Sequence, residues 1–468
     1  MKNVIIVGAG VAGELLEEDI KNNHSDINVI GFVDDNSCFD EKHILGLIDQ
    51  LPSITQKYKI DEIIVALPSA DGELMRKILL NLLNNKIPVK LIPRTQETIN
   101  KNLVAYGNVK NFSCEDFLGR AFRKSDTNLL SSIYANKRVF ITGGVGSIGS
   151  EIVRQLLDLD VEQVIVYDSS ELATFNLDQR LREQNIAPER YKLIIGNIVN
   201  RQKIDRAISE ENPDIIFHAA AYKHVYLMEN NIDEAIMNNV IGTKNVIDAA
   251  IKNKIKNFVF ISTDKVVNPT SIMGATKKLG EFYIKQFSDS LTKFDIVRFG
   301  NVINSNGSVL PLFEYQLDRY KYLTVTHKDV KRFFMSIREA AQLVISCLIR
   351  RDYGEIYILN MGELIKIYEI AQCLIRSKNS IVGEDVKINI IGLKKGEKMV
   401  EELFTESEMK NMEITELNNV YRLKSYDKCP KNINDIVSEL GDLVISSAAQ
   451  AEMRRYLHDV FDGIKMHS

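Results

Sequence analysis

The sequence predicts an α/β protein with two Rossmann-like, doubly wound parallel sheets. Strand-like apolar runs alternate with helical patterns along most of the 468 residues, as expected when helices cover both faces of a parallel sheet. A glycine-rich turn follows the first strand of each half and opens a helix, at residues 8–13 and 142–149. An aspartate ends the second strand of each half. Together these features predict two domains of similar architecture.

The first domain is predicted over residues 1–94. Its turn places Gly8, Gly10 and Gly13 in GxGxxG spacing, and Asp34 follows where an acid can bind ribose hydroxyls. This motif alone is weak, so a dinucleotide site and a glycine turn without a ligand remain equal alternatives. The strands of this domain are predicted at 3–7, 29–33, 62–67 and 88–92.

The second domain is predicted over residues 137–468, after a structured connector at 95–136. A helix is expected at 147–159, directly after the second glycine turn. The strands of this domain are predicted at 138–141, 163–167, 192–195, 214–218, 258–261 and 295–298.

The second glycine turn, TGGVGSIG, predicts an NAD site. Backbone amides and the N-terminal end of the next helix stabilise a pyrophosphate. Asp168 ends the following strand, about 20 residues beyond the last glycine, where its carboxylate can accept from the adenosine ribose and repel a 2′-phosphate. No arginine adjoins Asp168, which favours NAD over NADP. The turn residues assigned to the cofactor are Gly143, Gly146, Ser147, Ile148 and Gly149.

Composition excludes several other classes of protein. Hydrophobic residues make up 45% and charged residues 26%, and the net charge is −4, so the chain has no global attraction to nucleic acid or anionic lipid. Five scattered cysteines without a CxxC pair, and seven histidines without HxxxH spacing, predict reduced thiols and no metal site. No apolar run approaches the roughly 18 residues that span a bilayer.

A series of segments gives the chain a family resemblance. In order, they are TGGVGSIGSE, HAAAYKHV, NNVIGTKNV, STDKVVNP, MGATKKLGE, RFGNVINSNGSVLPLF, KRFFM and GLKKGEKMVEEL. The series resembles the extended short-chain dehydrogenase/reductases, and more closely the long-form nucleotide-sugar 4,6-dehydratases of bacterial polysaccharide and glycoprotein synthesis. Long members of that family carry an extra Rossmann-like domain before the catalytic one, and EDFLGR in the connector resembles theirs. The resemblance implies that the second domain ends in a UDP-sugar-binding part.

The resemblance also implies a catalytic set. A 4,6-dehydratase oxidises the sugar at C4 with NAD⁺, removes the C5 proton, expels the C6 hydroxyl and returns the hydride to C6, so it needs an acid and a base together. The neighbours Asp264 and Lys265 offer that pair, and Lys277 can hold the nicotinamide ribose. Met273 stands where most such enzymes have tyrosine, which resembles the members that retain configuration at C5. Thr263 is then the best candidate to contact the C4 hydroxyl, although Tyr222 and Tyr226 can compete for that role.

Other positions match the family with less force. Asn197 can accept from the adenine amine, and further cofactor contacts are assigned to Ile198, Ala219, Ala220 and Ala221. Lys394 and Lys395 stand where the family often has Arg-Pro, which leaves the second phosphate contact open. The residues assigned to the substrate, with Arg332 at the diphosphate and Glu397 at the uridine ribose, are Lys223, Met273, Asn301, Val309, Arg332, Lys394, Glu397 and Lys398.

The implied reaction converts UDP-N-acetylglucosamine to UDP-2-acetamido-2,6-dideoxy-α-D-xylo-hexos-4-ulose with retention at C5, an early step toward diamino-trideoxy sugars such as bacillosamine. One alternative is a UDP-sugar 4-epimerase, which the Asp264–Lys265 pair disfavours. Another is a non-catalytic nucleotide-sensing protein of a glycan-assembly complex, which Met273 and the extra Rossmann domain suggest. A homo-oligomer is expected.

The resemblance carries an expectation about cellular location. Full-length relatives usually have transmembrane helices before the first Rossmann domain, whereas this sequence begins at the first strand of that domain. The chain is therefore expected to be cytoplasmic as given, and to lie at the cytoplasmic side of the bacterial inner membrane through a region absent from it.

Overall fold

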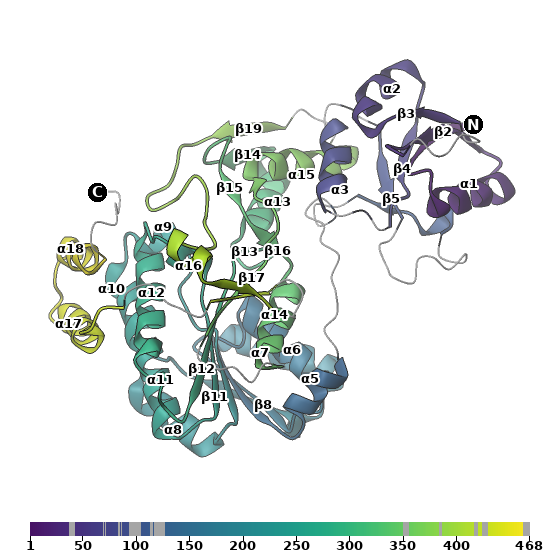
Figure 1. Ribbon diagram of the computed structural model, residues 1–468. Coiled ribbons are helices and arrows are strands. Elements are labelled where there is room, and N and C mark those ends of the chain that lie inside the picture. Colours follow the sequence, from purple (N-terminus) through teal and green to yellow (C-terminus); the bar gives the residue numbers. More distant parts are fainter. Residues whose placement is uncertain are drawn as a thin grey trace. The chain divides into compact units, whose positions relative to one another are not determined.

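Figure 1 shows the computed structural model. It divides into two compact units. Unit 1 comprises Met1–Arg123, Leu312–Asp329 and Ile365–Ile391, and unit 2 comprises Lys124–Pro311, Val330–Leu364 and Gly392–Ser468. The residues that the structure describes are 1–36, 43–68, 70, 72–82, 85, 87–92, 104–112, 116, 127–349, 355–382, 386–415, 420–423 and 429–461.

The core of unit 1 is a twisted sheet in which the first strand lies near the centre. Val4 to Val7 of that strand are completely buried because the sheet is covered on both faces, which explains their uninterrupted apolar sequence. The helix α1 (Val11–Asn23) packs on β2 through its buried side, Leu16 and Ile20. The strand order is β3 (Ile44–Gly46), β2 (Ile27–Val33), β1 (Lys2–Val7), β4 (Glu62–Val65), β5 (Val89–Leu91), β6 (Lys110–Asn111), with only β6 antiparallel.

Unit 1 also includes segments from late in the chain. The strand β14 (Tyr322–Val325) pairs in parallel with β19 (Lys387–Ile390), and the helix α15 (Ile367–Val382) contacts α3 (Gly72–Asn81). These segments lie within residues 137–468, which the sequence predicts to be a single second domain, so their place in unit 1 differs from that prediction. The predicted connector, including EDFLGR, falls mostly outside the described residues, so the domain boundaries near 94 and 136 stay predictions.

Unit 2 is built on a larger sheet, which confirms the predicted Rossmann-like fold. Each predicted strand of this domain is present within two residues of its expected bounds. The strand order reverses between β7 and β10, the kind of position where ligands bind in doubly wound folds. The described strands run in the order β9 (Tyr191–Ile195), β8 (Gln163–Asp168), β7 (Arg138–Thr142), β10 (Ile215–His218), β11 (Asn257–Ile261), β12 (Lys293–Arg298), β17 (Ile356–Leu359), β21 (Val420–Leu423), β20 (Met412–Ile414), and only β21 runs antiparallel to its neighbours.

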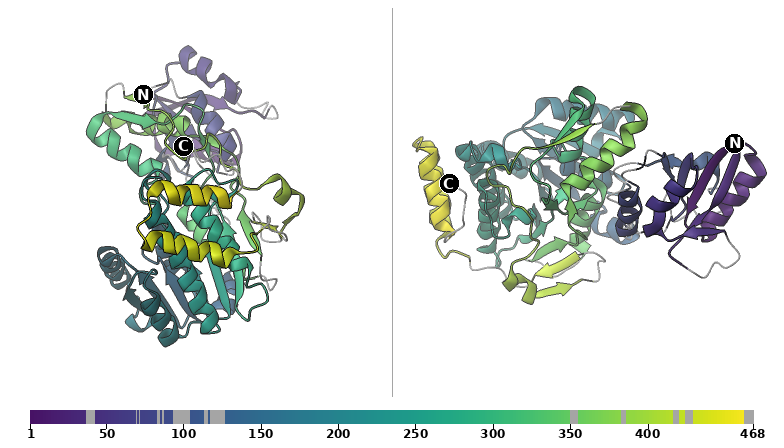
Figure 2. Two further views of the ribbon diagram at one scale, coloured as in Figure 1. Left: turned by 90° about the vertical axis from the view of Figure 1, so that its left-hand side faces the viewer. Right: turned by 90° about the horizontal axis from the view of Figure 1, so that it is seen from above.

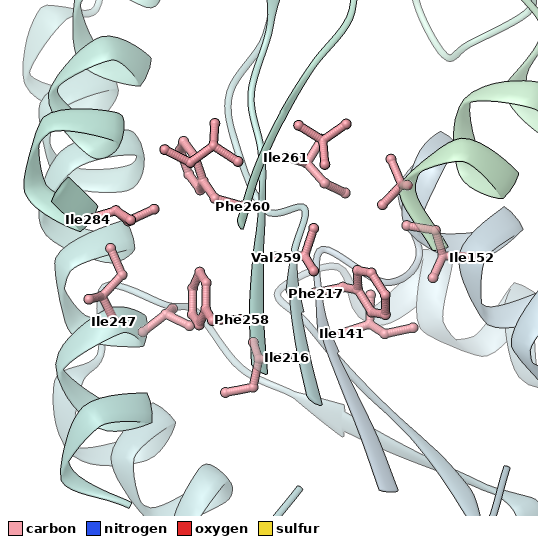
Figure 3. Packing of buried hydrophobic residues seen from close by; sticks show 14 of the residues in the cluster. Ile141, Ile152, Ile216, Phe217, Ile247, Phe258, Val259, Phe260, Ile261 and Ile284 are labelled. Atoms are coloured by element: carbon pink, nitrogen blue, oxygen red, sulfur yellow. The ribbon is translucent and has the colours of Figure 1, made fainter. Parts of the chain in front are cut away.

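Side chains alternate between the two faces of this sheet (Figure 3). Phe258 and Phe260 of β11 point to one face and pack near Ile247 and Ile284, whereas Val259 and Ile261 point to the other. Two sets of helices cover these faces (Figure 1). One set is α6 (Ser147–Leu157), α7 (Glu171–Glu183) and α14 (Ile337–Ser346), and the other is α8 (Arg201–Glu211), α11 (Thr243–Lys252) and α12 (Ile272–Lys285).

The end of the chain adds a second layer outside α12. The helices α17 (Ile433–Ile445) and α18 (Gln450–Val460) lie side by side (Figure 2), and α17 packs on α12. Arg454 of α18 donates to the buried Glu229 at 2.7 Å, which in turn accepts from the backbone of Ile272 at the start of α12. Within the described ranges, no helix is both long and apolar enough to cross a membrane.

Candidate active site

The turn between β7 and α6 can take only glycine at two positions. Gly143 has φ +68°, and a Cβ there would lie 2.6 Å from the backbone nitrogen of Ala220. A Cβ on Gly149 would lie 2.2 Å from the carbonyl oxygen of Gly143. Both contacts are shorter than any carbon can make. The turn is therefore held close to the end of β10 and leaves room for a ligand to approach the backbone.

The same turn offers hydrogen-bond donors to an anion. Gly146 precedes α6 and no side chain caps this helix, so the amides of its first turn point outward without a helical acceptor. At the end of β8, Asp168 Oδ2 accepts from the Val145 amide at 3.3 Å and Oδ1 accepts from the Ser170 amide at 3.0 Å. A carboxylate thus lies beside the glycine turn, and these groups fit the pyrophosphate and ribose of a dinucleotide.

The other residues predicted to hold the cofactor lie on neighbouring strand ends. Asn197 is exposed after β9 and its Oδ1 accepts from the Val199 amide at 2.9 Å, while Ile198 is buried. Ala219 continues from β10, its amide donating to the carbonyl of Thr142 at 3.0 Å, and Ala220 and Ala221 follow it. All lie at the carboxyl edge of the sheet, and their roles stay predictions.

The predicted acid–base pair is one connected cluster. The hydroxyl of Thr263 donates to Asp264 Oδ1 at 2.8 Å, and Lys265 Nζ donates to the same oxygen at 2.9 Å. Lys265 also donates to Asn301 Oδ1 at 3.1 Å. A Cβ on Gly274 would lie 2.3 Å from the Lys265 carbonyl, so this glycine lets α12 approach the cluster closely. The structure therefore places three predicted catalytic groups in contact.

Two carboxylates control the charge of Lys265. Burial disfavours its ammonium form, but Asp264 and Glu401 outweigh burial, so the pKa of Lys265 is raised above its ordinary value. The amine therefore carries a proton at neutral pH in the ligand-free chain.

Lys277 has the opposite electrostatics. Its side chain is buried on α12, with Nζ 3.9 Å from the centroid of the Phe260 ring. Burial lowers the pKa of Lys277 to about 7, despite the opposing charge of Glu281. Met273, one turn earlier on α12, is buried in the hydrophobic core cluster. The substrate contact predicted for Met273 stays a prediction.

The substitution Lys277→Met is expected to change how stability depends on pH. The folded chain has a pKa of about 7 at this lysine, whereas an unfolded lysine titrates near 10.4. The folded state therefore binds fewer protons between these values, and stability rises with pH across this window. Between about pH 8 and pH 6 the unmodified, cofactor-free chain should lose about 1 kcal/mol through this residue, and the variant should not. Hydrogen exchange of α12 measures the difference, and the exposed Lys252→Met should leave the pH dependence unchanged.

The structure gives contacts for further predicted substrate residues. Arg332 Nη2 lies 3.1 Å from Glu397 Oε1, and the same arginine donates to the carbonyl of Met399 at 3.3 Å. Lys398 Nζ donates to the carbonyl of Val267 at 2.9 Å. The remaining assigned cations also have partners: Lys394 lies over the ring of Tyr226, and Lys223 donates to Ser305. Val309 begins α13 (Val309–Tyr320).

Sequence reasoning missed two features of this region. Glu401 is buried beside Lys265 and Arg332, and it stands four residues after Glu397 in the quoted GEKMVEEL segment, which was the available signal. A buried ionic network lies behind the cluster, where Arg298 pairs with Glu281 and Glu408 and the hydroxyl of Ser262 donates to Glu281. No local pattern predicts that network.

Comparison with known families gives two matches. Residues 139–425 match the family described as polysaccharide biosynthesis protein, and residues 1–93 match a family described as CoA-binding domain. The chain is 35% identical over 450 residues to the capsular polysaccharide biosynthesis protein CapD of Staphylococcus aureus, which covers 94% of this chain and 74% of CapD. It is 34% identical over 298 residues to a UDP-glucose 4-epimerase of Rickettsia canadensis, covering 62% of this chain and 84% of the epimerase.

Solved structures give a consistent comparison. Pen from Bacillus thuringiensis is 34% identical, with a TM-score of 0.59, over 66% of this chain and 98% of Pen. A dTDP-glucose 4,6-dehydratase of Streptomyces venezuelae, solved with NAD bound, has a TM-score of 0.51 at 22% identity, over 58% of this chain and 89% of that one. The second likeness shows the fold alone.

Proposed function

This chain belongs to the polysaccharide biosynthesis protein family, and we propose that it catalyses the NAD-dependent 4,6-dehydration of UDP-N-acetylglucosamine with retention of configuration at C5. The observation that carries the proposal is the shared oxygen of Asp264, which accepts from Thr263 at 2.8 Å and from Lys265 at 2.9 Å. An acid, a base and a hydroxyl relay in direct contact are what such a dehydration needs.

The cluster provides a closed path for protons. The Thr263 hydroxyl receives the proton of the C4 hydroxyl as that carbon is oxidised and passes its own proton to Asp264. Uncharged Lys265 removes the C5 proton, and protonated Asp264 gives its proton to the departing C6 hydroxyl, which leaves as water. Lys265 finally returns a proton to C5. The proton lost at C4 thus leaves in the water, and both side chains return to their initial states.

NAD⁺, when bound, accepts the hydride from C4 and returns it to C6. The chain positions it through the Gly143–Gly149 turn, the Asp168 carboxylate and Lys277. Arg332 offers a charged fork to the diphosphate of the substrate, and Glu397 can accept from the uridine ribose. Arg332 and Glu397 form an ion pair at 3.1 Å, so substrate binding exchanges part of that pair for contacts to the nucleotide.

A UDP-sugar 4-epimerase is the second candidate. It is favoured by the 34% identity to an enzyme named UDP-glucose 4-epimerase over 84% of that protein. An epimerase returns its hydride to C4 and does not need an acid at C6 or a base at C5. The Asp264–Lys265 pair therefore supports the dehydratase.

The two candidates, and a non-catalytic sensor, are separated by incubating the protein with UDP-N-acetylglucosamine and measuring the product by mass spectrometry. Loss of one water supports the dehydratase, an isomer of unchanged mass supports the epimerase, and an unchanged substrate supports the sensor. Running the reaction in D₂O and assigning C5 by NMR tests the retaining outcome. An inverted product would contradict it.

Cofactor preference gives a separate prediction. Asp168→Asn should weaken NAD binding about ten- to a hundredfold, because a charge-assisted hydrogen bond to the ribose is replaced by a neutral one. It should also relax the discrimination against NADP, because the negative charge facing a 2′-phosphate is gone. The asparagine keeps one oxygen, so it can accept only one of the two backbone bonds that Val145 and Ser170 make to separate carboxylate oxygens. Titration of both cofactors measures the effect, and strong NADP preference in the unmodified protein would show that Asp168 does not face the ribose.

A further inference from the structure

Glu401 presents a carboxyl group to the catalytic cluster and has no part in the mechanism above. Its side chain is only 4% exposed, with Oε1 3.8 Å from Lys265 Nζ and 3.7 Å from Arg332 Nε. Among the described residues, Oε2 is buried and has no hydrogen-bond partner. A buried carboxyl oxygen without a partner lowers the stability of the folded state. This cost points to a role for Glu401 at the reacting centre.

The proposed proton path starts from uncharged Lys265 and so does not say where the proton goes that Lys265 carries in the ligand-free chain. Lys265 must be uncharged before it can remove the C5 proton, yet the two carboxylates beside it favour its charged form. Asp264 cannot take that proton, because it must be free to receive the C4 proton through Thr263. Glu401 is the other acid that faces the amine.

The electrostatic surroundings come from several elements. Asp264 and Lys265 belong to the turn after β11, while Glu401 follows Lys398 on the segment after β19. Arg332 and Lys398 favour the ionised form of Glu401, and Asp264 opposes it. Lys223, on the loop after β10, repels the charge of Lys265.

We propose that Glu401 is a positioning residue that takes the surplus proton of Lys265, so that the amine becomes a base while the proton stays inside the site. The inference rests on the proposed dehydratase function. The step moves one proton from Nζ to a Glu401 oxygen, leaves a neutral amine and a neutral acid, and changes no other bond. The present 3.8 Å separation must shorten by about 1 Å to reach hydrogen-bond distance, or one water must bridge it.

The protonation of Glu401 fits this role. Burial raises the pKa of Glu401, and although Lys265 opposes the shift, the net direction is upward from the ordinary value. A carboxyl group of this kind can exchange a proton with a neighbouring amine more readily than an exposed one can. After the product leaves, the proton returns to Lys265 and the cluster regains its initial charge.

The test is Glu401→Gln, which keeps the shape but cannot take the proton. The readout is the rate of deuterium incorporation at C5 from UDP-N-acetylglucosamine in D₂O, measured against pH. In the unmodified protein the rate of deuterium incorporation should fall at low pH, in the acid limb of the profile, only once Glu401 is already protonated and cannot take the proton of Lys265. In the variant the proton must leave to solvent, so the acid limb should move to higher pH by about one unit or more, and the rate near neutral pH should fall about tenfold.

The direction of the shift separates this role from a simple charge effect. If Glu401 only stabilised the Lys265 ammonium, its removal would lower the pKa of Lys265 and move the acid limb to lower pH. Glu401→Asp should keep the limb near its original position, because a carboxyl group remains. Glu406→Gln is the matched control, since that nearby side chain is exposed and should leave the acid limb unmoved.

If the acid limb of an active Glu401→Gln variant moved to lower pH or did not move, the inference would be overturned, while the proposed function would stand. Absence of any dehydrated product from the unmodified protein would overturn both. Circular dichroism and the content of bound NAD confirm that each variant is folded.

Discussion

Replacing Lys265 with methionine should lower the rate of deuterium incorporation at C5 by about 10²–10⁴-fold, the usual loss when a general base is removed. Methionine keeps the length and the apolar stem of lysine but cannot take a proton. Lys265 Nζ contacts both Asp264 Oδ1 and Asn301 Oδ1 in the cluster. Among the described residues, no other amine makes these two contacts and could replace Lys265 as the base. NAD should remain bound, because the glycine turn and Asp168 lie on other strand ends.

A second lysine supplies the control for this experiment. Lys256→Met changes a side chain that is 74% exposed and pairs with Asp214 at 3.7 Å, so turnover should stay normal. Mass spectrometry of product formed in D₂O measures both variants. Near-normal deuterium incorporation by Lys265→Met would remove this lysine from the mechanism, and loss of NAD from it would show that the substitution acts on the cofactor site instead.

The strands were predictable because their signals are local. An apolar run ending at a glycine turn predicted a strand at 138–141, and the structure has β7 at Arg138–Thr142. The pairing of β14 with β19 was not predictable in the same way. Their apolar residues pair across more than sixty positions of sequence, and no turn or spacing links them. Sequence order alone therefore places these strands within the second domain.

The residues of the candidate site also differ in whether a local sequence signal predicts them. Thr263, Asp264 and Lys265 are consecutive, so one recognised segment brought all three together, and their contacts follow from a short turn at the end of β11. Glu401 joins that cluster only through the folding of a distant segment. Glu397, four residues earlier, was identified because the family resemblance gave it a role. The contact between Glu401 and Lys265 can be seen only in the three-dimensional structure.

Arg298 is the clearest case of a residue whose importance depends on the fold. It ends β12 completely buried and makes two hydrogen bonds of 2.7 Å to Glu281, with a third of 2.7 Å to Glu408. Burial opposes the charge of Arg298, but the two carboxylates raise its pKa above the ordinary value. The arginine and Ser262 also help to hold the pKa of Glu281 at about 2. Glu281 thus stays ionised inside the protein, and Arg298 lies between it and the buried Glu408.

Arg298→Met should therefore destabilise unit 2 by about 3–5 kcal/mol, the usual cost of breaking a buried ion pair by removing one partner. The loss comes mainly from leaving Glu281 and Glu408 buried without their shared cation, since Lys278 lies farther from Glu281, at 3.5 Å. Hydrogen exchange of β11 and β12 peptides is the suitable measurement, because the chain has two units and its unfolding need not be a single transition. The stability of Arg298→Lys should fall between that of the unmodified protein and that of Arg298→Met, because lysine keeps the charge without the planar fork.

An exposed ion pair provides the contrast that isolates burial as the cause. Arg182 contacts Asp178 at 2.7 Å, the same distance as in the buried network, but its side chain is 64% exposed. Arg182→Met should cost less than about 1 kcal/mol, because water replaces the lost partner. Because Glu281 also accepts from Ser262, which precedes Thr263 of the proposed catalytic cluster, protection should fall first at the end of β11 in Arg298→Met. Equal protection in the two variants would show that the buried network does not stabilise the segment that carries the proposed catalytic cluster.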